Sequence, residues 1–149
     1  MPEKGNLLAR LPIGCTSSAV DCDPLIKAAW EARQHGYSPY SNFRVGAAVM
    51  TADGRIFGGC NVENISFGLT LCAERVAVAV AVAAGAQALV AVAVVAETGL
   101  PISPCGACRQ VLAEFGVRRV LLVNRIQQLE FALEDLLPRA MVGILDRPG

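Results

Sequence analysis

The longest apolar stretch of the chain lies near its middle. Residues 76–96 read VAVAVAVAAGAQALVAVAVVA and contain no charged residue, so the stretch is long enough to cross a bilayer as one helix. Gly85 and Gln87 interrupt its centre, and Glu97 follows it directly. These residues favour two buried elements joined by a turn over a membrane span.

Periodicity does not distinguish helix from strand in this stretch, because Ala and Val are both apolar. The Ala-rich half follows Glu74 and Arg75 and stops at Gly85, which predicts a helix over residues 72–84. The Val-rich half predicts a buried strand over residues 89–95.

Patterns elsewhere in the chain predict the remaining elements. A helix is expected from Pro24 to His35, because an Asp stands at its start and Gly36 at its end. We also predict a hairpin with strands at 45–51 and 55–60 around Asp53-Gly54, a helix at 105–115, a strand from Arg118 to Asn124 and a short helix at 132–137. This order of elements predicts a sheet with helices on both faces.

Size and charge narrow the class of protein. The chain has 149 residues, of which 54% are hydrophobic, enough for one core and hardly for two. We expect an N-terminal extension over residues 1–21 and a single domain over residues 22–149. Thirteen basic and thirteen acidic residues cancel, which argues against a nucleic acid polymer or a membrane as the main partner. A small neutral substrate fits better.

The amino-terminal sequence MPEKGNLLARLPIG carries mixed charges and lacks the apolar core of a signal peptide. Export and disulfide formation therefore have no support, and we expect a reducing compartment, the cytoplasm.

The cysteines carry the first chemical signal. Cys105 and Cys108 form a Cys-x-x-Cys pair at the start of a predicted helix. A helix amino terminus lowers the pKa of a thiol, so the pair suits either a redox couple or two metal ligands. The pair alone does not separate the two.

Cys72 favours the metal. It also stands at a predicted helix start, and Glu74 follows two residues later, a combination for which a redox couple has no use. Three thiolates leave one corner of a tetrahedral zinc site free for water, and a carboxylate that is not a ligand can move protons. Zinc-dependent nucleobase deaminases have this arrangement, in which water attacks C4 of cytosine.

Five stretches together are more specific than any one of them. They are SPYSNFRVGAA (38–48), GCNVEN (59–64), CAER (72–75), SPCGACRQVLAEFG (103–116) and LLP (136–138). With these motifs in this order, the chain resembles the small zinc-dependent cytidine deaminases over about residues 38–138. The resemblance implies a three-layer α/β/α sandwich with a mixed central sheet of about five strands.

The resemblance also implies an activity and its main residues. It assigns Cys72, Cys105 and Cys108 to one Zn²⁺ per chain and Glu74 to proton transfer. The expected reaction is the hydrolysis of cytidine and 2′-deoxycytidine to uridine, 2′-deoxyuridine and ammonia, in pyrimidine salvage. The alternative for Glu74 is an ordinary residue of the first helical turn.

Three thiolates on a divalent ion leave a net charge of minus one, which must be offset. Two helix amino termini contribute partial positive charge, and the resemblance assigns Arg75 to hydrogen bonds with thiolate sulfur. The alternative for Arg75 is a side chain in the first helical turn that faces solvent and does not contact the thiolates. For Arg109 we expect a solvent-facing side chain.

The motif Asn61-Val62-Glu63 suggests how the sugar is held. Strand alternation predicts that Asn61 and Glu63 lie on one side while Val62 points into the core. The resemblance assigns this Asn and Glu to the ribose 3′-hydroxyl and Phe43 to the base. A carboxylate at that hydroxyl would repel a phosphate, so nucleosides should enter the site and polynucleotides should not.

The resemblance adds Phe67 and Ala73 to the substrate contacts. Phe67 departs from the family, which commonly has Tyr there, and the tail RAMVGILDRPG lacks the family's usual aromatic residue, for which Met141 is the candidate substitute. Of the remaining candidates, we expect Cys60 to be a buried small residue, His35 to cap the first helix, and Cys15 and Cys22 to be free thiols.

The resemblance further implies a homotetramer. A helix that is apolar on every side, as residues 76–84 are, needs more cover than a chain of this size provides.

Three alternative functions remain compatible with the sequence. They are a deaminase of another aminopyrimidine nucleoside such as a blasticidin-type antibiotic, a noncatalytic zinc-binding module, which needs a fourth ligand, and a redox protein.

Overall fold

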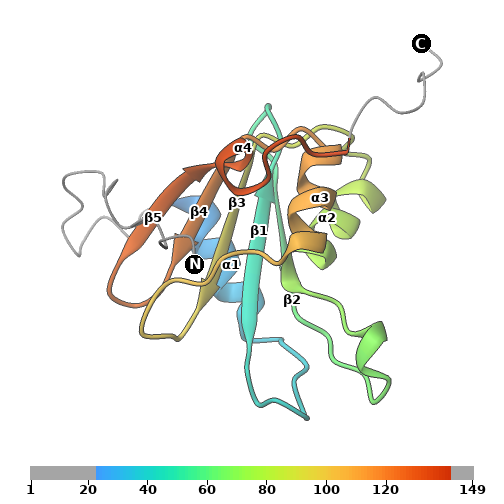
Figure 1. The fold of residues 1–149 in the computed structure, drawn as a ribbon, viewed down its shortest axis with the longest axis vertical. Coiled ribbons are helices and arrows are strands. Elements are labelled where there is room, and N and C mark those ends of the chain that lie inside the picture. Colours follow the sequence, from blue (N-terminus) through green and yellow to red (C-terminus); the bar gives the residue numbers. More distant parts are fainter. Residues whose placement is uncertain (1–22, 142–149) are drawn as a thin grey trace, which may run out of the picture.

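A mixed sheet of five strands forms the centre of the structure, a computed structural model in which residues 23–141 are described (Figure 1). The strand order is β2-β1-β3-β4-β5; β3 and β4 pair in parallel, and the other neighbours are antiparallel. The strands are β1 (Val45–Met50), β2 (Ile56–Cys60), β3 (Ala91–Ala96), β4 (Arg119–Val123) and β5 (Gln128–Ala132). The predicted fold class is confirmed.

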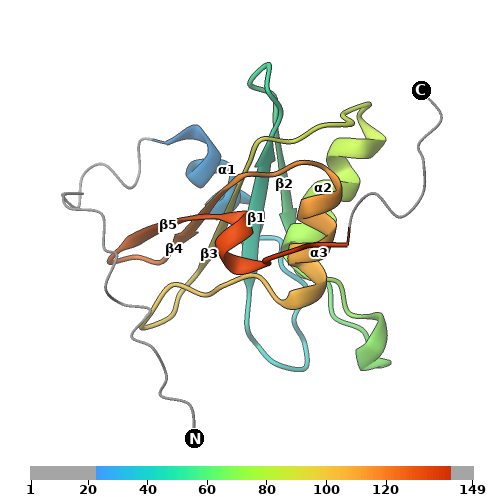
Figure 2. The same cartoon turned by 45° about the horizontal axis from the view of Figure 1, so that its top comes forward.

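Helices cover both faces of the sheet (Figures 1 and 2). One face holds α1, whereas the other holds α2 and α3, with the short α4 after β5. The helices are α1 (Pro24–Arg33), α2 (Ala73–Ala83), α3 (Gly106–Glu114) and α4 (Leu133–Leu136). Between β2 and α2, a segment with the short 3-10 helix η2 (Phe67–Leu69) projects beyond the sheet.

The central strand β3 is buried along its whole length, which explains why its sequence does not alternate. Val92 and Val94 pack toward α2 and α3, whereas Ala93 and Val95 pack toward α1. Both layers of the core therefore meet at this strand.

The apolar stretch of residues 76–96 forms two elements, as predicted. Helix α2 ends at Ala83, Gly85 takes a positive φ of 93°, and the chain returns as β3. Across residues 23–141, the structure contains no helix of the length and apolar character that a membrane span requires.

The predicted hairpin is confirmed, with Met50 paired to Ile56. Its turn contains Gly54 at a φ of 88°, a conformation that glycine adopts without steric cost. The first helix also begins as predicted, since the Asp23 side chain accepts a hydrogen bond from the Leu25 amide at 2.9 Å.

Strand β5 is absent from the order of elements that local sequence predicts. Its five residues, QLEFA, form an edge strand with no fully buried position, so the alternation of Leu129 and Phe131 with polar neighbours is short and weak. The turn before it depends on Asn124, whose buried Oδ1 accepts the amides of Ile126 and Gln127, both at 2.8 Å.

Two glycines allow the helices to approach the sheet. A Cβ at Gly46 would lie 2.0 Å from the carbonyl oxygen of Ala29 in α1, and one at Gly59 would lie 2.3 Å from the backbone nitrogen of Ala77 in α2. Real Cβ atoms do not come so close to backbone, so only glycine fits at both positions. Gly59 thereby sets the position of α2, whose first turn carries candidate site residues.

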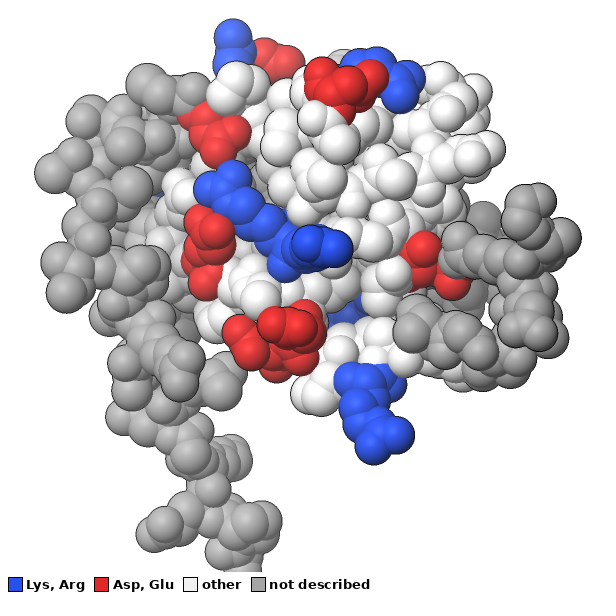
Figure 3. Space-filling view, turned by 90° about the horizontal axis from the view of Figure 1, so that it is seen from above, with Lys and Arg blue, Asp and Glu red and all other residues white. Residues whose placement is uncertain are grey.

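The surface carries both signs of charge. On the face seen in Figure 3, acidic and basic side chains lie next to one another, and a broad area has no charged side chain. This face therefore lacks the continuous basic surface that would attract a nucleic acid polymer.

Candidate metal and substrate site

Two helix starts bring three cysteines together. Cys72 is the N-cap residue of α2, Cys105 is the N-cap residue of α3, and Cys108 lies in the first turn of α3. Their sulfur atoms all lie within 4.8 Å of one another, and the Cys72 and Cys105 sulfurs are 3.9 Å apart. The structure therefore places together the three side chains that the sequence singled out as ligands.

The spacing of the sulfurs fits zinc. Bonds of about 2.3 Å in a tetrahedral site place two thiolate sulfurs about 3.8 Å apart. Within residues 23–141, no further His, Cys, Asp or Glu joins this group. Three sulfur donors without a fourth match a site that keeps one position for water or substrate.

The contact between Cys72 and Cys108 shifts the pKa values of their thiols in opposite directions. A hydrogen bond with Cys108 lowers the pKa of Cys72 to about 5, and contacts with Arg75 act in the same direction. The hydrogen bond with Cys72 and burial raise the pKa of Cys108. A bound divalent cation favours the thiolate form of all its cysteine ligands.

Positive groups surround the cluster. Cys72 and Cys105 stand at the N-cap positions of α2 and α3, and the start of a helix carries partial positive charge. Arg75 Nη2 lies 3.8 Å from the Cys72 sulfur and 3.2 Å from the Thr70 oxygen. Arg75 therefore lies against the thiols, where a residue that offsets their charge must be.

Arg109 differs from the solvent-facing position that we expected. It is half-buried, and it donates from Nε to the Pro104 oxygen at 2.8 Å and from Nη1 to the Leu136 oxygen at 2.6 Å. The side chain folds back because these two carbonyl groups lie beside the start of α3. It thus braces the backbone next to Cys105.

Glu74 is buried beside the thiols, with 4% of its surface exposed. Burial raises the pKa of its carboxyl group, and the negative charge of Cys72 acts in the same direction, against hydrogen bonds that lower it. A carboxyl group in this setting holds a proton more readily than an exposed one. Its place suits the predicted proton transfer.

A pocket of about 340 Å³ lies beside the projecting segment. The rings of Tyr40 and Phe67 meet edge to face at 5.9 Å between centroids. The lining residues are Tyr40, Ser41, Glu63, Phe67 and Thr70. Glu63 and Phe67 were predicted as substrate contacts, whereas sequence reasoning assigned no role to Tyr40 and Ser41, although both lie in the SPYSNFRVGAA motif.

Glu63 holds the loop at one side of this pocket. Its carboxylate accepts the backbone amides of Tyr40 at 2.9 Å and Ser41 at 3.3 Å, together with the Ser41 hydroxyl. The hydroxyl contact is the main reason why the pKa of Glu63 lies below its usual value. Glu63 is therefore a charged acceptor whose position the loop fixes.

Asn61 bridges the entry to β1. Its Nδ2 donates to the Phe43 oxygen at 2.8 Å, and its Oδ1 accepts the Val45 amide at 2.9 Å. The prediction that Val62 points into the core is wrong, because Val62 is 37% exposed whereas Asn61 is 9% exposed. Strand β2 ends at Cys60, and Val62 bridges Tyr37 and Leu71 instead, so the alternation of the strand no longer applies.

The other predicted contacts lie at different depths. Phe43 is exposed at the start of the segment that Asn61 holds, whereas Ala73 is buried in the core at the start of α2.

Three further candidates lie outside the thiol cluster. Cys60 is half-buried, so it is less enclosed than predicted. His35 is exposed in the turn after α1, where its amide donates to the Ala32 oxygen. Met141 is exposed, and its backbone makes two hydrogen bonds with Gln110. Cys15, Cys22 and the predicted extension over residues 1–21 lie outside the described residues.

Several known proteins are similar to this chain over most of its length. Residues 21–124 match the family described as the cytidine and deoxycytidylate deaminase zinc-binding region. Cytidine deaminase from Sporosarcina psychrophila is 48% identical, covering 81% of this chain and 91% of its own. The Mycobacterium tuberculosis H37Rv enzyme is 45% identical, covering 87% and 95%.

Solved structures agree with this relationship. Cytidine deaminase from Burkholderia pseudomallei is 50% identical, with a TM-score of 0.75 over 85% of this chain and 99% of its own. The structure of the enzyme from Mycobacterium tuberculosis is 45% identical, with a TM-score of 0.67 over 77% and 92%.

Proposed function

This chain belongs to the cytidine and deoxycytidylate deaminase family, and we propose that it hydrolyses cytidine and 2′-deoxycytidine to uridine and 2′-deoxyuridine. In this reaction the oxygen of water forms a bond to C4 of the pyrimidine, the bond from C4 to the amino nitrogen breaks, and ammonia leaves. One observation carries the proposal. The sulfurs of Cys72, Cys105 and Cys108 converge beside the buried Glu74 without a fourth ligand side chain among residues 23–141.

The three cysteines would hold one zinc ion per chain. When bound there, zinc lowers the pKa of a water molecule at its fourth position. Arg75 and the two helix starts offset the negative charge of the thiolates. Thiolates weaken the effect of zinc on the pKa of water, and this positive charge would reduce that weakening.

Glu74 would move the protons of the reaction. Its carboxylate would accept the two protons of the water in turn and would deliver one to ring N3 and the other to the departing amino group. Because burial raises its pKa, the Glu74 carboxylate accepts a proton near neutral pH more readily than an exposed carboxylate, and it holds that proton until the transfer.

The pocket lined by Tyr40, Glu63 and Phe67 would take the nucleoside. Glu63 and Asn61 have acceptor and donor capacity beyond their present contacts, and together they suit the ribose 3′-hydroxyl. Phe43 would lie against the base, and Ala73 at the start of α2 would complete the contacts. The fixed negative charge of Glu63 disfavours a phosphate at the same position, which selects nucleosides over polynucleotides.

Four copies of the chain would form the working enzyme. Val80 and Val82 on α2 are each 43% exposed, so the helix that is apolar on every side remains partly uncovered in the single chain. The projecting segment adds exposed Ile65, Phe67 and Leu69. Burial of these side chains between copies would remove apolar surface from water.

The expected setting is the cytoplasm, in pyrimidine salvage. Thiols that bind a metal must remain reduced, and a cytosolic glutathione pool keeps them so. A nucleoside deaminase there recovers pyrimidines that are already free.

A direct assay tests the proposed function. Purified protein is mixed with cytidine or deoxycytidine, the loss of ultraviolet absorbance is followed, and metal content is measured in parallel. We expect turnover with one zinc per chain. Turnover of a different aminopyrimidine nucleoside only, or zinc without any turnover, would contradict the proposal in favour of the antibiotic-type deaminase or the noncatalytic module.

A further inference from the structure

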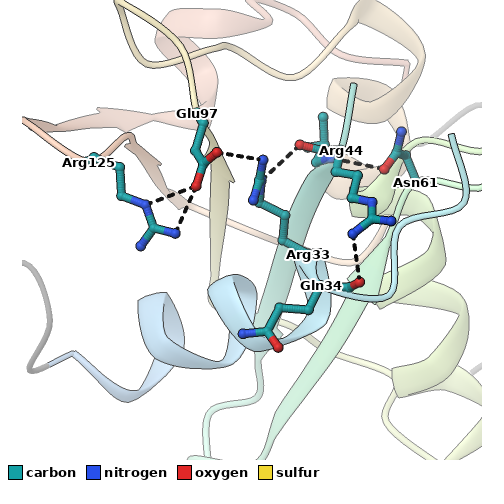
Figure 4. Close-up of polar contacts among 7 residues, drawn as sticks. Arg33, Gln34, Arg44, Asn61, Glu97 and Arg125 are labelled. Carbon is teal, nitrogen blue, oxygen red and sulfur yellow. Dashed lines mark hydrogen bonds and ion pairs between the residues drawn. The ribbon is translucent and has the colours of Figure 1, made fainter. Parts of the chain in front are cut away.

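Arg33, the last residue of α1, lies where three distant parts of the chain meet. Figure 4 shows its guanidinium group between Glu97, which follows β3, and the backbone of Arg44, which precedes β1. Arg33 Nη2 is 3.3 Å from Glu97 Oε2, and Arg33 Nε donates to the Arg44 oxygen at 3.0 Å. The Arg33 side chain is 17% exposed, whereas that of Glu97 is 50% exposed, so the arginine is the more buried member of the pair.

Close packing fixes the base of this side chain. A Cβ at Gly46 would lie 2.6 Å from Arg33 Cβ, so α1 rests directly on β1 at this point. Arg44 also reaches back, because its Nη1 donates to the Gln34 oxygen at 3.3 Å. The end of α1 and the entry to β1 are therefore joined by two reciprocal hydrogen bonds.

The segment 43–45 is held from its other side by Asn61. The Phe43 oxygen and the Val45 amide are both bonded to the Asn61 side chain. The Arg44 oxygen between them is the group that Arg33 binds. Three backbone groups of this segment are thus bound by two side chains from different parts of the chain.

Glu97 gives Arg33 a firm anchor. Arg125 donates from Nη2 to Glu97 Oε1 at 2.9 Å, and its guanidinium carbon lies 3.8 Å from the centre of the Trp30 ring. The loop that begins at Glu97 is also held by the buried Asn124, whose Nδ2 donates to the Thr98 oxygen at 2.9 Å. This loop leads to the metal-ligand helix α3.

We propose that Arg33 is a positioning residue for nucleoside binding, tying segment 43–45, with Phe43 and its contacts to Asn61, to the anchored loop at Glu97. The inference rests on the proposed function, because that proposal assigns Phe43 and Asn61 to substrate contacts. Loss of the tie leaves the Arg44 oxygen without its donor and lets the segment shift. Binding of the nucleoside weakens while the thiol cluster stays intact.

The variant Arg33→Met tests this assignment. We expect KM for cytidine to rise about tenfold, as loss of one hydrogen bond to an aligned segment implies, while kcat stays within about twofold. Zinc content stays at the wild-type value, and hydrogen exchange of the Val45 amide becomes faster. A KM equal to that of the wild type would overturn the proposal.

Arg119→Met is the matched control. Arg119 pairs with Glu130 at 2.7 Å near the other edge of the sheet, so its loss also removes an arginine ion pair. Its KM should stay at the wild-type value, and an equal rise in both variants would show that only general stability is affected. Should Arg33→Met fail to fold, Glu97→Gln is expected to raise KM in the same direction, and an unchanged KM would overturn the anchor.

Failure of the proposed function has a different signature. A wild-type protein that does not turn over cytidine would end the proposed function, whereas exchange at Val45 still reports on the tie. Unchanged exchange at Val45 in Arg33→Met would overturn the tie alone.

Discussion

The two carboxylates of the site have opposite environments. Glu74 is buried next to thiols, and burial raises its pKa, whereas Glu63 accepts hydrogen bonds from the loop at Ser41, and its pKa is lowered. Pairs of acids whose pKa values are pushed apart divide the work of a site. Here one suits proton transfer and the other suits a permanent negative acceptor.

Glu74→Gln tests the first of these roles. The amide has nearly the same size but cannot accept and deliver protons, so kcat should fall by about 10²- to 10⁴-fold. Zinc content should remain at one per chain, because the cysteines are intact. Steady-state kinetics with metal analysis measures both, and a kcat within tenfold of the wild type would rule out the assigned proton transfer.

Glu63→Ala tests the sugar contact. A charge-assisted hydrogen bond is worth about 1.5 to 3 kcal/mol, so kcat/KM for cytidine should fall by about 10- to 150-fold. With 3′-deoxycytidine as the substrate, the same variant should lose little, because the hydroxyl partner is already absent.

Ser41→Ala is the control for the loop. It removes the hydroxyl that Glu63 binds while it retains the carboxylate, so its effect should be the same with both substrates. An equal loss with cytidine and 3′-deoxycytidine in Glu63→Ala would mean that Glu63 supports the loop and not the sugar.

At the scale of elements, the position of α2 depends on its contact with β2. A Cβ at Gly59 would approach both the Ala77 nitrogen at 2.3 Å and the Ala73 oxygen at 2.6 Å, one residue from Cys72. The helix that carries a metal ligand and Glu74 therefore lies as close to the sheet as backbone atoms allow.

Gly59→Ala should consequently displace α2. We expect a loss of about 1 to 3 kcal/mol in the free energy of unfolding, as overpacked cores show, together with weaker zinc binding. Gly99→Ala is the control, because a Cβ there meets no atom within 4 Å. Urea unfolding and zinc competition measure the two effects, and equal stability of both variants would contradict the close contact.

Local sequence predicted most elements because their ends carry clear signals. Asp23 begins α1, Gly54 turns the hairpin, and Gly85 ends the region of α2, each through backbone conformation or capping. Strand β5 lacks such signals, since it is short and half-exposed at an edge. The direction of Val62 was predicted wrongly because sequence patterns do not show where a strand leaves its sheet.

The sequence predicted some residues of the candidate site and not others. Cys72, Cys105 and Cys108 were found through helix starts and family motifs, and the structure brings them together. The loop contacts of Glu63 and the tie at Arg33 were not found, because they join residues far apart in the sequence. Their hydrogen bonds depend on how α1, β1 and the projecting segment pack, which no local pattern encodes.

At the scale of the whole molecule, the proposed assembly of four copies is tested through the exposed apolar surface on α2. Light scattering should give about four times the mass of one chain. Val80→Asp should lower this mass, because it places a charge on a helix face that we expect other copies to cover. Ala52→Asp, at the exposed hairpin tip, is the control and should keep the wild-type mass. A wild-type monomer with full activity would contradict the assembly.

The family relationship and the geometry of the site both support one central proposal. In it, three sulfurs hold zinc and leave one coordination position open beside Glu74. X-ray absorption spectroscopy of the zinc-loaded protein tests it most directly. We predict three sulfur neighbours at about 2.3 Å and one oxygen neighbour at about 2.0 Å. Four sulfur neighbours, or a nitrogen ligand from a side chain in the fourth position, would contradict it.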